Sequence, residues 1–166
     1  MSAYELAQLN IGIAKGSMDG PVMADFAANL DRINALADRS PGFVWRLQTE
    51  EGNATSIHAF EDENMLLNMS VWRDLESLSG FVYRSSHTEI MRRRREWFER
   101  MSEAYMVLWW VPEGHRPSIA EAVARLDTLR SNGPCAEAFT FRNAFPAPDA
   151  GPARESASFG DECPAT

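Results

Sequence analysis

Cysteine and histidine are scarce in this chain of 166 residues. It holds two cysteines, Cys135 and Cys163, and three histidines. Two cysteines make no disulfide framework, and no CxxC pair of the kind that binds structural zinc is present. The chain also lacks a basic, apolar leader and any run of about 20 apolar residues, which a bilayer span requires. We therefore expect a soluble, cytoplasmic protein without a structural metal.

Positive charge is outnumbered, because 16 Lys and Arg stand against 24 Asp and Glu, for a net charge of -8. Such a charge opposes nonspecific binding to nucleic acid and to anionic membranes, so neither is an expected partner. His58, His87 and His115 are not at metal-ligand spacing, and no metal is expected. No glycine-rich phosphate loop, GxSxG motif or catalytic cysteine context occurs, which argues against nucleotide cofactors and acyl-enzyme chemistry.

The length and the hydrophobic content of 45% suit one core. We expect a single domain over residues 1–145. Residues 146–166 are rich in Pro, Gly, Ser and acidic residues and have almost no apolar pattern, so we expect a disordered tail there.

Hydrophobic periodicity predicts the order of the elements. Residues 6–13 alternate, with Gln8 and Asn10 on one face and Leu9 and Ile11 on the other. Ser118 and Glu121 have the spacing of a capping box. The patterns predict strands at 6–13, 43–49, 66–72 and 105–111, a short strand at 55–60 and a last strand at 138–143, with helices at 22–39, 73–80, 86–102 and after Ser118.

This order is that of an α+β protein with a ferredoxin-like βαββαβ unit, in which an antiparallel sheet carries helices on one face. A further helix and strand are appended at the C-terminal end. The other sheet face is also apolar in places, and an uncovered apolar face favours a second subunit. We therefore expect a homodimer through that face.

The predicted helix at 86–102 places two polar residues on its apolar face. His87 and Arg94 share a stripe with large apolar side chains, whereas Arg92, Arg93 and Arg95 point away and are expected to be solvated. Burying a polar or charged group costs several kcal/mol unless a partner satisfies it, so this face either contacts buried acceptors or lines a pocket. The apolar members of the stripe are Ile90, Met91, Trp97, Phe98 and Met101.

The segments MSVWRDLESL and FVYRSSH resemble the signature of antibiotic-biosynthesis-monooxygenase-type proteins of the dimeric α/β barrel superfamily. Longer blocks, from LAQLNIG through RINALADRSPGFVWRLQ and RRRREWFERM to EAFTFRNAF, resemble a bacterial family labelled only as a domain of unknown function. The resemblance implies a dimer of ferredoxin-like subunits, each with a cavity between sheet and helices. The superfamily includes cofactor-free oxygenases acting on phenolic polyketides, polyketide cyclases, haem-degrading monooxygenases, haem dehydratases and members without known activity.

Asn10 and Trp72 are similar to the two positions that face haem in the haem-degrading relatives. Their haem-ligating histidine lies near the middle of the helix, where this chain has arginines, whereas His87 is at the helix start. This departure favours a protein without a cofactor, with haem as the alternative.

We expect His87 to act as the catalytic acid or base and Arg94 to bind an anionic oxygen of the substrate. Both residues also have a structural interpretation, as a hydrogen-bonded helix-start histidine and a paired arginine. The expected function is that of a monooxygenase-like or cyclase-like enzyme for a small aromatic or polyketide-like substrate. The alternatives are a binding protein for a small hydrophobic ligand, haem included, and a structural dimer whose pocket is filled. The expected substrate-binding residues are Asn10, Asn68, Trp72, Tyr83 and Trp97.

Overall fold

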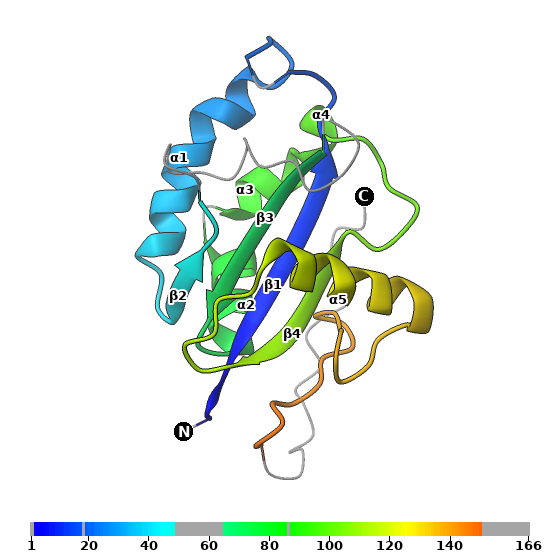
Figure 1. Ribbon diagram of the computed structural model, residues 1–166. Helices are drawn as coiled ribbons and strands as arrows, with labels where there is room; N and C mark the ends of the chain where they lie inside the picture. Colours follow the sequence, from blue (N-terminus) through cyan, green and yellow to red (C-terminus); the bar gives the residue numbers. More distant parts are fainter. Residues whose placement is uncertain (1, 18, 49–64, 86, 151–166) are drawn as a thin grey trace.

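The computed structural model describes residues 2–17, 19–48, 65–85 and 87–150. Figure 1 shows the chain as a sheet with helices on both sides. The strands are β1 (Tyr4–Ile13), β2 (Phe43–Arg46), β3 (Met65–Trp72) and β4 (Met106–Pro112). The helices are α1 (Ala24–Asp38), α2 (Leu75–Arg84), α3 (His87–Arg92), α4 (Arg94–Trp97) and α5 (Ile119–Asn132).

The described strands form one antiparallel sheet with the order β2-β3-β1-β4. Each neighbouring pair is antiparallel, with Asn10 opposite Asn68 between β1 and β3, and Gln8 opposite Leu108 between β1 and β4. The element order and this strand order together confirm the predicted ferredoxin-like βαββαβ unit.

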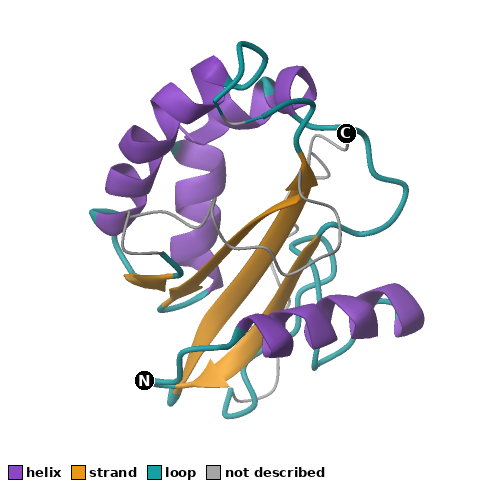
Figure 2. Cartoon of the chain, turned by 45° about the horizontal axis from the view of Figure 1, so that its top comes forward, coloured by secondary structure: helices purple, strands orange, loops and turns teal. Residues whose placement is uncertain are grey.

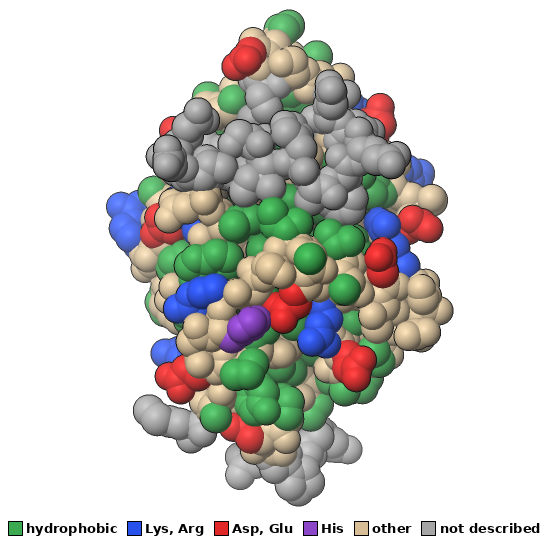
Figure 3. Space-filling model, in the orientation of Figure 1, with side chains coloured by type: hydrophobic (Ala, Val, Ile, Leu, Met, Phe, Trp, Pro, Cys, Tyr) green, Lys and Arg blue, Asp and Glu red, His purple; other side chains and the backbone are tan. Residues whose placement is uncertain are grey.

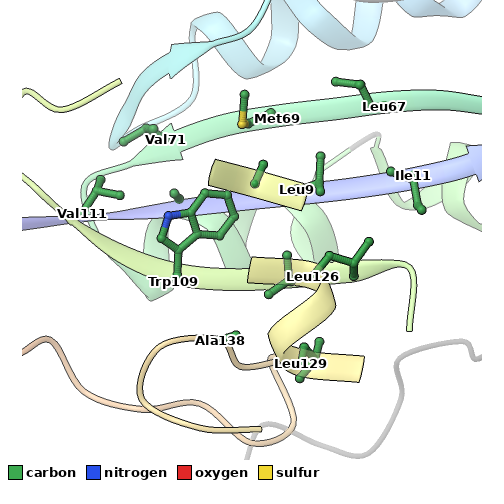
Figure 4. Packing of buried hydrophobic residues seen from close by; sticks show 13 residues of the cluster. Leu9, Ile11, Leu67, Met69, Val71, Trp109, Val111, Leu126, Leu129 and Ala138 are labelled. Carbon is green, nitrogen blue, oxygen red and sulfur yellow. The ribbon is translucent and has the colours of Figure 1, made fainter. Parts of the chain in front are cut away.

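The central strand β1 is covered on both faces. Leu9 and Ile11 are buried on the face toward α5, in a core with Met69, Trp109 and Leu126 (Figure 4). The alternate residues of β1 point to the other face, as the alternation predicted. That second face holds polar residues and lies under α1, α2, α3 and α4.

The appended helix α5 lies on the opposite side of the sheet from the other helices (Figure 2). Its N-cap forms as predicted, since Ser118 Oγ accepts a hydrogen bond from Glu121 N at 3.1 Å. Its apolar stripe, including Ala122, Leu126 and Leu129, is buried against this face of the sheet. The helix therefore occupies part of the surface through which we predicted dimerisation. The homodimer stays a prediction.

The single helix predicted at 86–102 is wrong. The chain forms α3, turns at Arg93, forms the short α4 and leaves the helical conformation at Phe98. Phe98 forms a bridge with Ala14, and Glu99 N donates to Ile13 O at 2.8 Å. Pairing with the end of β1 overrides the local helical periodicity, because backbone groups at the edge of a buried sheet require partners.

The last predicted strand, at 138–143, is also wrong. Among the described residues this region makes only isolated bridges, from Phe139 to Leu108 and from Ala138 to Cys135. The short strand predicted at 55–60 lies outside the described residues. The first part of the predicted tail lies against the N-terminal residues, since Ala3 N donates to Asp149 Oδ2 at 2.6 Å and Ser2 Oγ to Asp149 Oδ1 at 2.7 Å. The backbone bond from Ala3 and the hydroxyl bond from Ser2 lower the pKa of Asp149.

On the face that carries α5, the described charged side chains of both signs alternate with hydrophobic patches (Figure 3). Among the described helices, none combines the length and the apolar character needed to cross a membrane.

The N-cap of α2 provides a test of the fold. Asp74 Oδ1 accepts hydrogen bonds from Ser77 N at 2.8 Å and Ser77 Oγ at 2.6 Å. Burial alone raises the pKa of Asp74, but the bonds from Ser77 and the neighbouring Arg73 outweigh it and lower the pKa. We expect Asp74→Ala to reduce the free energy of unfolding by about 1 kcal/mol at neutral pH.

Because the pKa of Asp74 is lower in the folded state, the ionised side chain stabilises the fold at any pH above the pKa that Asp74 has in the unfolded chain, about 4. This stabilisation is lost as the pH falls through the pKa of the folded state. The difference between the unmodified protein and Asp74→Ala in urea unfolding should therefore shrink toward about pH 3. Asp127→Ala, on the exposed side of α5, is the matched control and should change little. An equal loss in both variants would contradict this role of Asp74.

Candidate functional site

A cavity of about 170 Å³ lies between the sheet and α1, α2, α3 and α4. This is close to the roughly 150 Å³ of an apolar cavity that holds benzene. The walls come mostly from apolar side chains of the helices, and polar side chains of β1 and β3 form the floor. The apolar helix residues of the wall are Phe26, Leu30, Ile33, Ala37, Leu78, Phe81, Val82, Ile90, Met91 and Trp97.

The floor carries a hydrogen-bonded ladder of four polar side chains. Gln8 Nε2 donates to Asn68 Oδ1 at 2.7 Å and to Ser70 Oγ at 2.8 Å. Asn10 Nδ2 donates to Gln8 Oε1 at 3.1 Å and to Asn68 Oδ1 at 3.4 Å. Gln8 and Ser70 are buried, so these bonds provide the partners that buried polar groups require. The ladder exists because strand alternation places all four residues on one face.

The ladder leaves two amide groups available to a ligand. Among the described residues, neither Asn10 Oδ1 nor Asn68 Nδ2 has a hydrogen-bond partner. The side chain of Asn34, on α1, also lines the cavity and has no partner in the described part of the chain, although the residue is only 9% exposed. The cavity therefore presents both acceptors and donors in an apolar setting, an arrangement typical of small-molecule sites.

Trp72 forms one wall at the end of β3. It is 1% exposed, its Nε1 donates to Ser70 Oγ at 2.9 Å, and its ring stacks on Phe81 with centroids 5.1 Å apart. Phe43 meets the same ring edge-on at 5.4 Å. The hydrogen bond to Ser70 fixes the indole and connects this wall to the polar floor.

Arg94 lies at the other end of the cavity, where β4 no longer pairs with β1. Its Nη2 donates to Ile11 O at 3.0 Å, and its guanidinium lies 4.5 Å from the Tyr105 ring centroid and 5.0 Å from that of Phe98. Arg94 thus bonds a backbone carbonyl at the end of β1, whereas the structural interpretation expected a buried acid or the C-terminal end of a helix. It also lines the cavity.

Arg93 is partly exposed, with 37% of its side chain accessible, and it forms ion pairs at the surface. Its guanidinium pairs with Asp25 at 2.8 Å and with Glu96 at 2.7 Å, and lies 4.6 Å from the Trp97 ring centroid. The hydrogen bonds that Arg93 donates to Glu96 and Asp25 raise the pKa of Arg93, and the bond from Arg93 lowers the pKa of Glu96. Arg93 thereby connects α4 to the start of α1.

At the other end of α1, Asp38 pairs with Arg46 Nε at 2.8 Å. Arg46 lies on β2, lines the cavity and has a side chain that is 13% exposed. Arg46 and Asn34 are not predicted as site residues by the sequence, because the block that contains them indicates the family and not a position in a site. The helix over the cavity is thus connected by an ion pair at each end.

The structure brings Asn10, Asn68, Trp72, Arg94 and Trp97 to one cavity, but Tyr83 is not among its described lining residues. Tyr83 packs edge-on against Phe141, which lines the cavity, at 5.5 Å between centroids. His87 begins α3, and its side chain lies outside the described part of the structure, as does His58.

The described residues contain no group of three or more His, Cys, Asp or Glu arranged to hold a metal ion. His115 Nε2 lies 3.1 Å from Glu121 Oε1, near the start of α5 and on the other side of the sheet.

A family model described as "Domain of unknown function (DUF3291)" matches residues 5–155. The chain is similar to SnoaB, a cofactor-independent oxygenase from Streptomyces nogalater, with 17% identity over 70% of this chain and 98% of SnoaB and a TM-score of 0.43. It is also similar to PA3566 from Pseudomonas aeruginosa, with 15% identity over 71% of this chain and 98% of that chain and a TM-score of 0.45. No curated protein matches the chain.

Two glycines give a matched test of the close packing around the cavity. A Cβ added at Gly12, on the cavity floor, would lie 2.6 Å from Phe98 Cδ1, whereas one added at Gly80, inside α2, meets nothing within 4 Å. We expect Gly12→Ala to destabilise the protein by about 1–3 kcal/mol through overpacking. Gly80→Ala should stabilise it by about 0.5–1 kcal/mol through helix propensity. Thermal unfolding measures both, and shifts in the same direction would contradict the described packing.

Proposed function

The chain belongs to the family described as a domain of unknown function (DUF3291), as its sequence resemblance predicted, and because that description names no activity we propose a function from the residues of the cavity. The protein acts on a small aromatic or polyketide-like molecule, as a cofactor-independent enzyme of the oxygenase or cyclase type. The supporting observation is the polar ladder with open amide groups on Asn10 and Asn68, set in an apolar cavity that Arg94 also lines. The apolar walls accept a ring system, and the amides hold its oxygen atoms.

The proposed chemistry begins with the removal of a proton from an acidic O–H or C–H group of the substrate. This step gives a phenolate or enolate, whose negative charge is spread over oxygen and ring carbon. Amide donors and a guanidinium fixed beside the oxygen stabilise that charge more than they stabilise the neutral substrate, which lowers the barrier. In this proposal Asn68 Nδ2 and Arg94 stabilise the oxyanion.

The base in this proposal is His87, whose unperturbed pKa of about 6.5 suits proton transfer near neutral pH. Trp72 and Trp97 provide flat apolar walls for the ring, and Asn10 Oδ1 accepts a hydrogen bond from a neutral hydroxyl. A carrier that binds the same molecule without chemistry would need the same walls and amides but not the base. Turnover therefore separates the two functions.

Haem binding is not supported by the described part of the cavity. Its lining residues that could bind iron are Met91, Tyr105 and Met106, with no imidazole among them. The Tyr105 ring is covered by the guanidinium of Arg94.

If the open amide of Asn68 binds the ligand, shortening this side chain should lower the affinity for a phenolic ligand. Asn68→Ala removes the open donor and should weaken binding of 2-naphthol, a neutral phenolic probe, by about five- to tenfold, equivalent to roughly 1–1.4 kcal/mol. Isothermal titration calorimetry measures the dissociation constant. Asn132→Ala, at the exposed end of α5, is the control and should bind as the unmodified protein does. Equal affinities in all three proteins would contradict the assignment of Asn68.

The proposed catalysis is tested by measuring turnover, as oxygen uptake or product formation, with a panel of phenols and enolisable aromatic ketones. His87→Ala and Arg94→Ala should each lower turnover by about 100-fold or more, with Arg94→Lys retaining part of it. Arg92→Ala, at an exposed position of the same arginine run, is the control. Full turnover in the His87 and Arg94 variants would contradict their roles. Ligand binding without any turnover by the unmodified protein would favour the carrier.

A further inference from the structure

A second hollow, of about 210 Å³, lies next to the cavity and is rich in positive charge. Its described lining includes the basic side chains of Lys15, Arg94, Arg95 and Arg100, with Glu99 as the only acid among them. The chain as a whole has a net charge of -8. A local cluster of basic side chains attracts anions to this part of the surface, although the protein as a whole is acidic.

The backbone fixes this basic hollow in place. Lys15 N donates to Trp97 O at 2.8 Å and Glu99 N donates to Ile13 O at 2.8 Å, so the end of β1 and the segment after α4 run side by side. Lys15 Nζ also donates to the carbonyl oxygen of Arg95. The basic residues therefore come together through hydrogen bonds between segments about 80 residues apart, and the hollow is held in place by the sheet.

The basic hollow and the main cavity share two residues. Arg94 and Tyr105 line both, with the guanidinium 4.5 Å from the Tyr105 ring centroid. Arg94 is also held by Ile11 O at 3.0 Å. The two hollows therefore adjoin at Arg94 and Tyr105.

We propose that the basic hollow is a subsite for an anionic group, a carboxylate or a phosphate monoester, carried by the same ligand whose ring system binds in the main cavity. Lys15 and Arg100 bind the anionic oxygens, because ammonium and guanidinium donors form strong charge-assisted hydrogen bonds with such groups. This inference rests on the proposed function. It narrows the substrate class to aromatic acids or aromatic phosphates.

Two probes of nearly equal shape test the subsite. 2-Naphthylacetate carries a negative charge, and 2-naphthylacetamide is its neutral counterpart. We expect the acid to bind the unmodified protein about tenfold more tightly than the amide in calorimetric titrations at low salt, and the ratio to fall at high salt through screening.

The double variant Lys15→Gln with Arg100→Gln should reduce that ratio to about one or two while leaving the amide's affinity unchanged, since neither residue is among the described lining of the main cavity. Arg39→Gln with Arg92→Gln changes the net charge equally at exposed positions elsewhere and should keep the ratio.

Each other outcome overturns the inference in a distinguishable way. If acid and amide bind the unmodified protein equally, and Asn68→Ala weakens both, the basic hollow is no subsite but the proposed function stands. If both double variants reduce the ratio alike, the preference reflects net charge and not the basic hollow. If neither probe binds, the proposed function fails together with the subsite.

Discussion

The backbone at the end of β1 needs hydrogen-bond partners after β4 leaves it, and this requirement shapes the functional end of the molecule. Ile11 N donates to Tyr105 O at 2.9 Å, and Ile11 O accepts from Arg94. Farther along, the segment 97–99 supplies the partners, so α4 must end at Trp97. Unpaired backbone groups inside a protein cost free energy comparable to a lost hydrogen bond. The same contacts place Arg94 beside the cavity and hold Trp97 in its wall.

The cavity floor shows how a buried polar network can leave a site open. Gln8 and Ser70 are satisfied within the ladder, which therefore stabilises the sheet face instead of destabilising it. The outer members, Asn10 and Asn68, use one half of each amide for the ladder and leave the other half toward the cavity. Asn10 is partly buried and Asn68 is exposed, so water bonds the open halves until a ligand displaces it.

Period-two alternation was enough to predict which residues of β1 and β3 face the cavity, and helical angles identified Arg94 although the predicted helix is broken. Both signals are local. The break at Arg93 and the pair between Arg93 and Asp25, 68 residues apart, depend on long-range contacts that no local pattern contains. The same holds for Asn34 and Arg46, which enter the cavity only because α1 and β2 pack there. The segment 138–143 has a composition that favours a strand, but in the structure it forms only isolated bridges at residues 138 and 139.

The attachment of α1 has a kinetic consequence. The helix covers the cavity and buries few side chains, among them Ile33, Asn34 and Ala37, while ion pairs hold it at Asp25 and at Asp38. Exposed ion pairs contribute little to stability and weaken as salt rises. The sheet does not depend on these pairs, so a local opening of α1 would leave it intact. Because α1 also supplies Phe26, Leu30 and Ile33 to the cavity wall, such an opening would change both how fast a ligand enters and how tightly it is held.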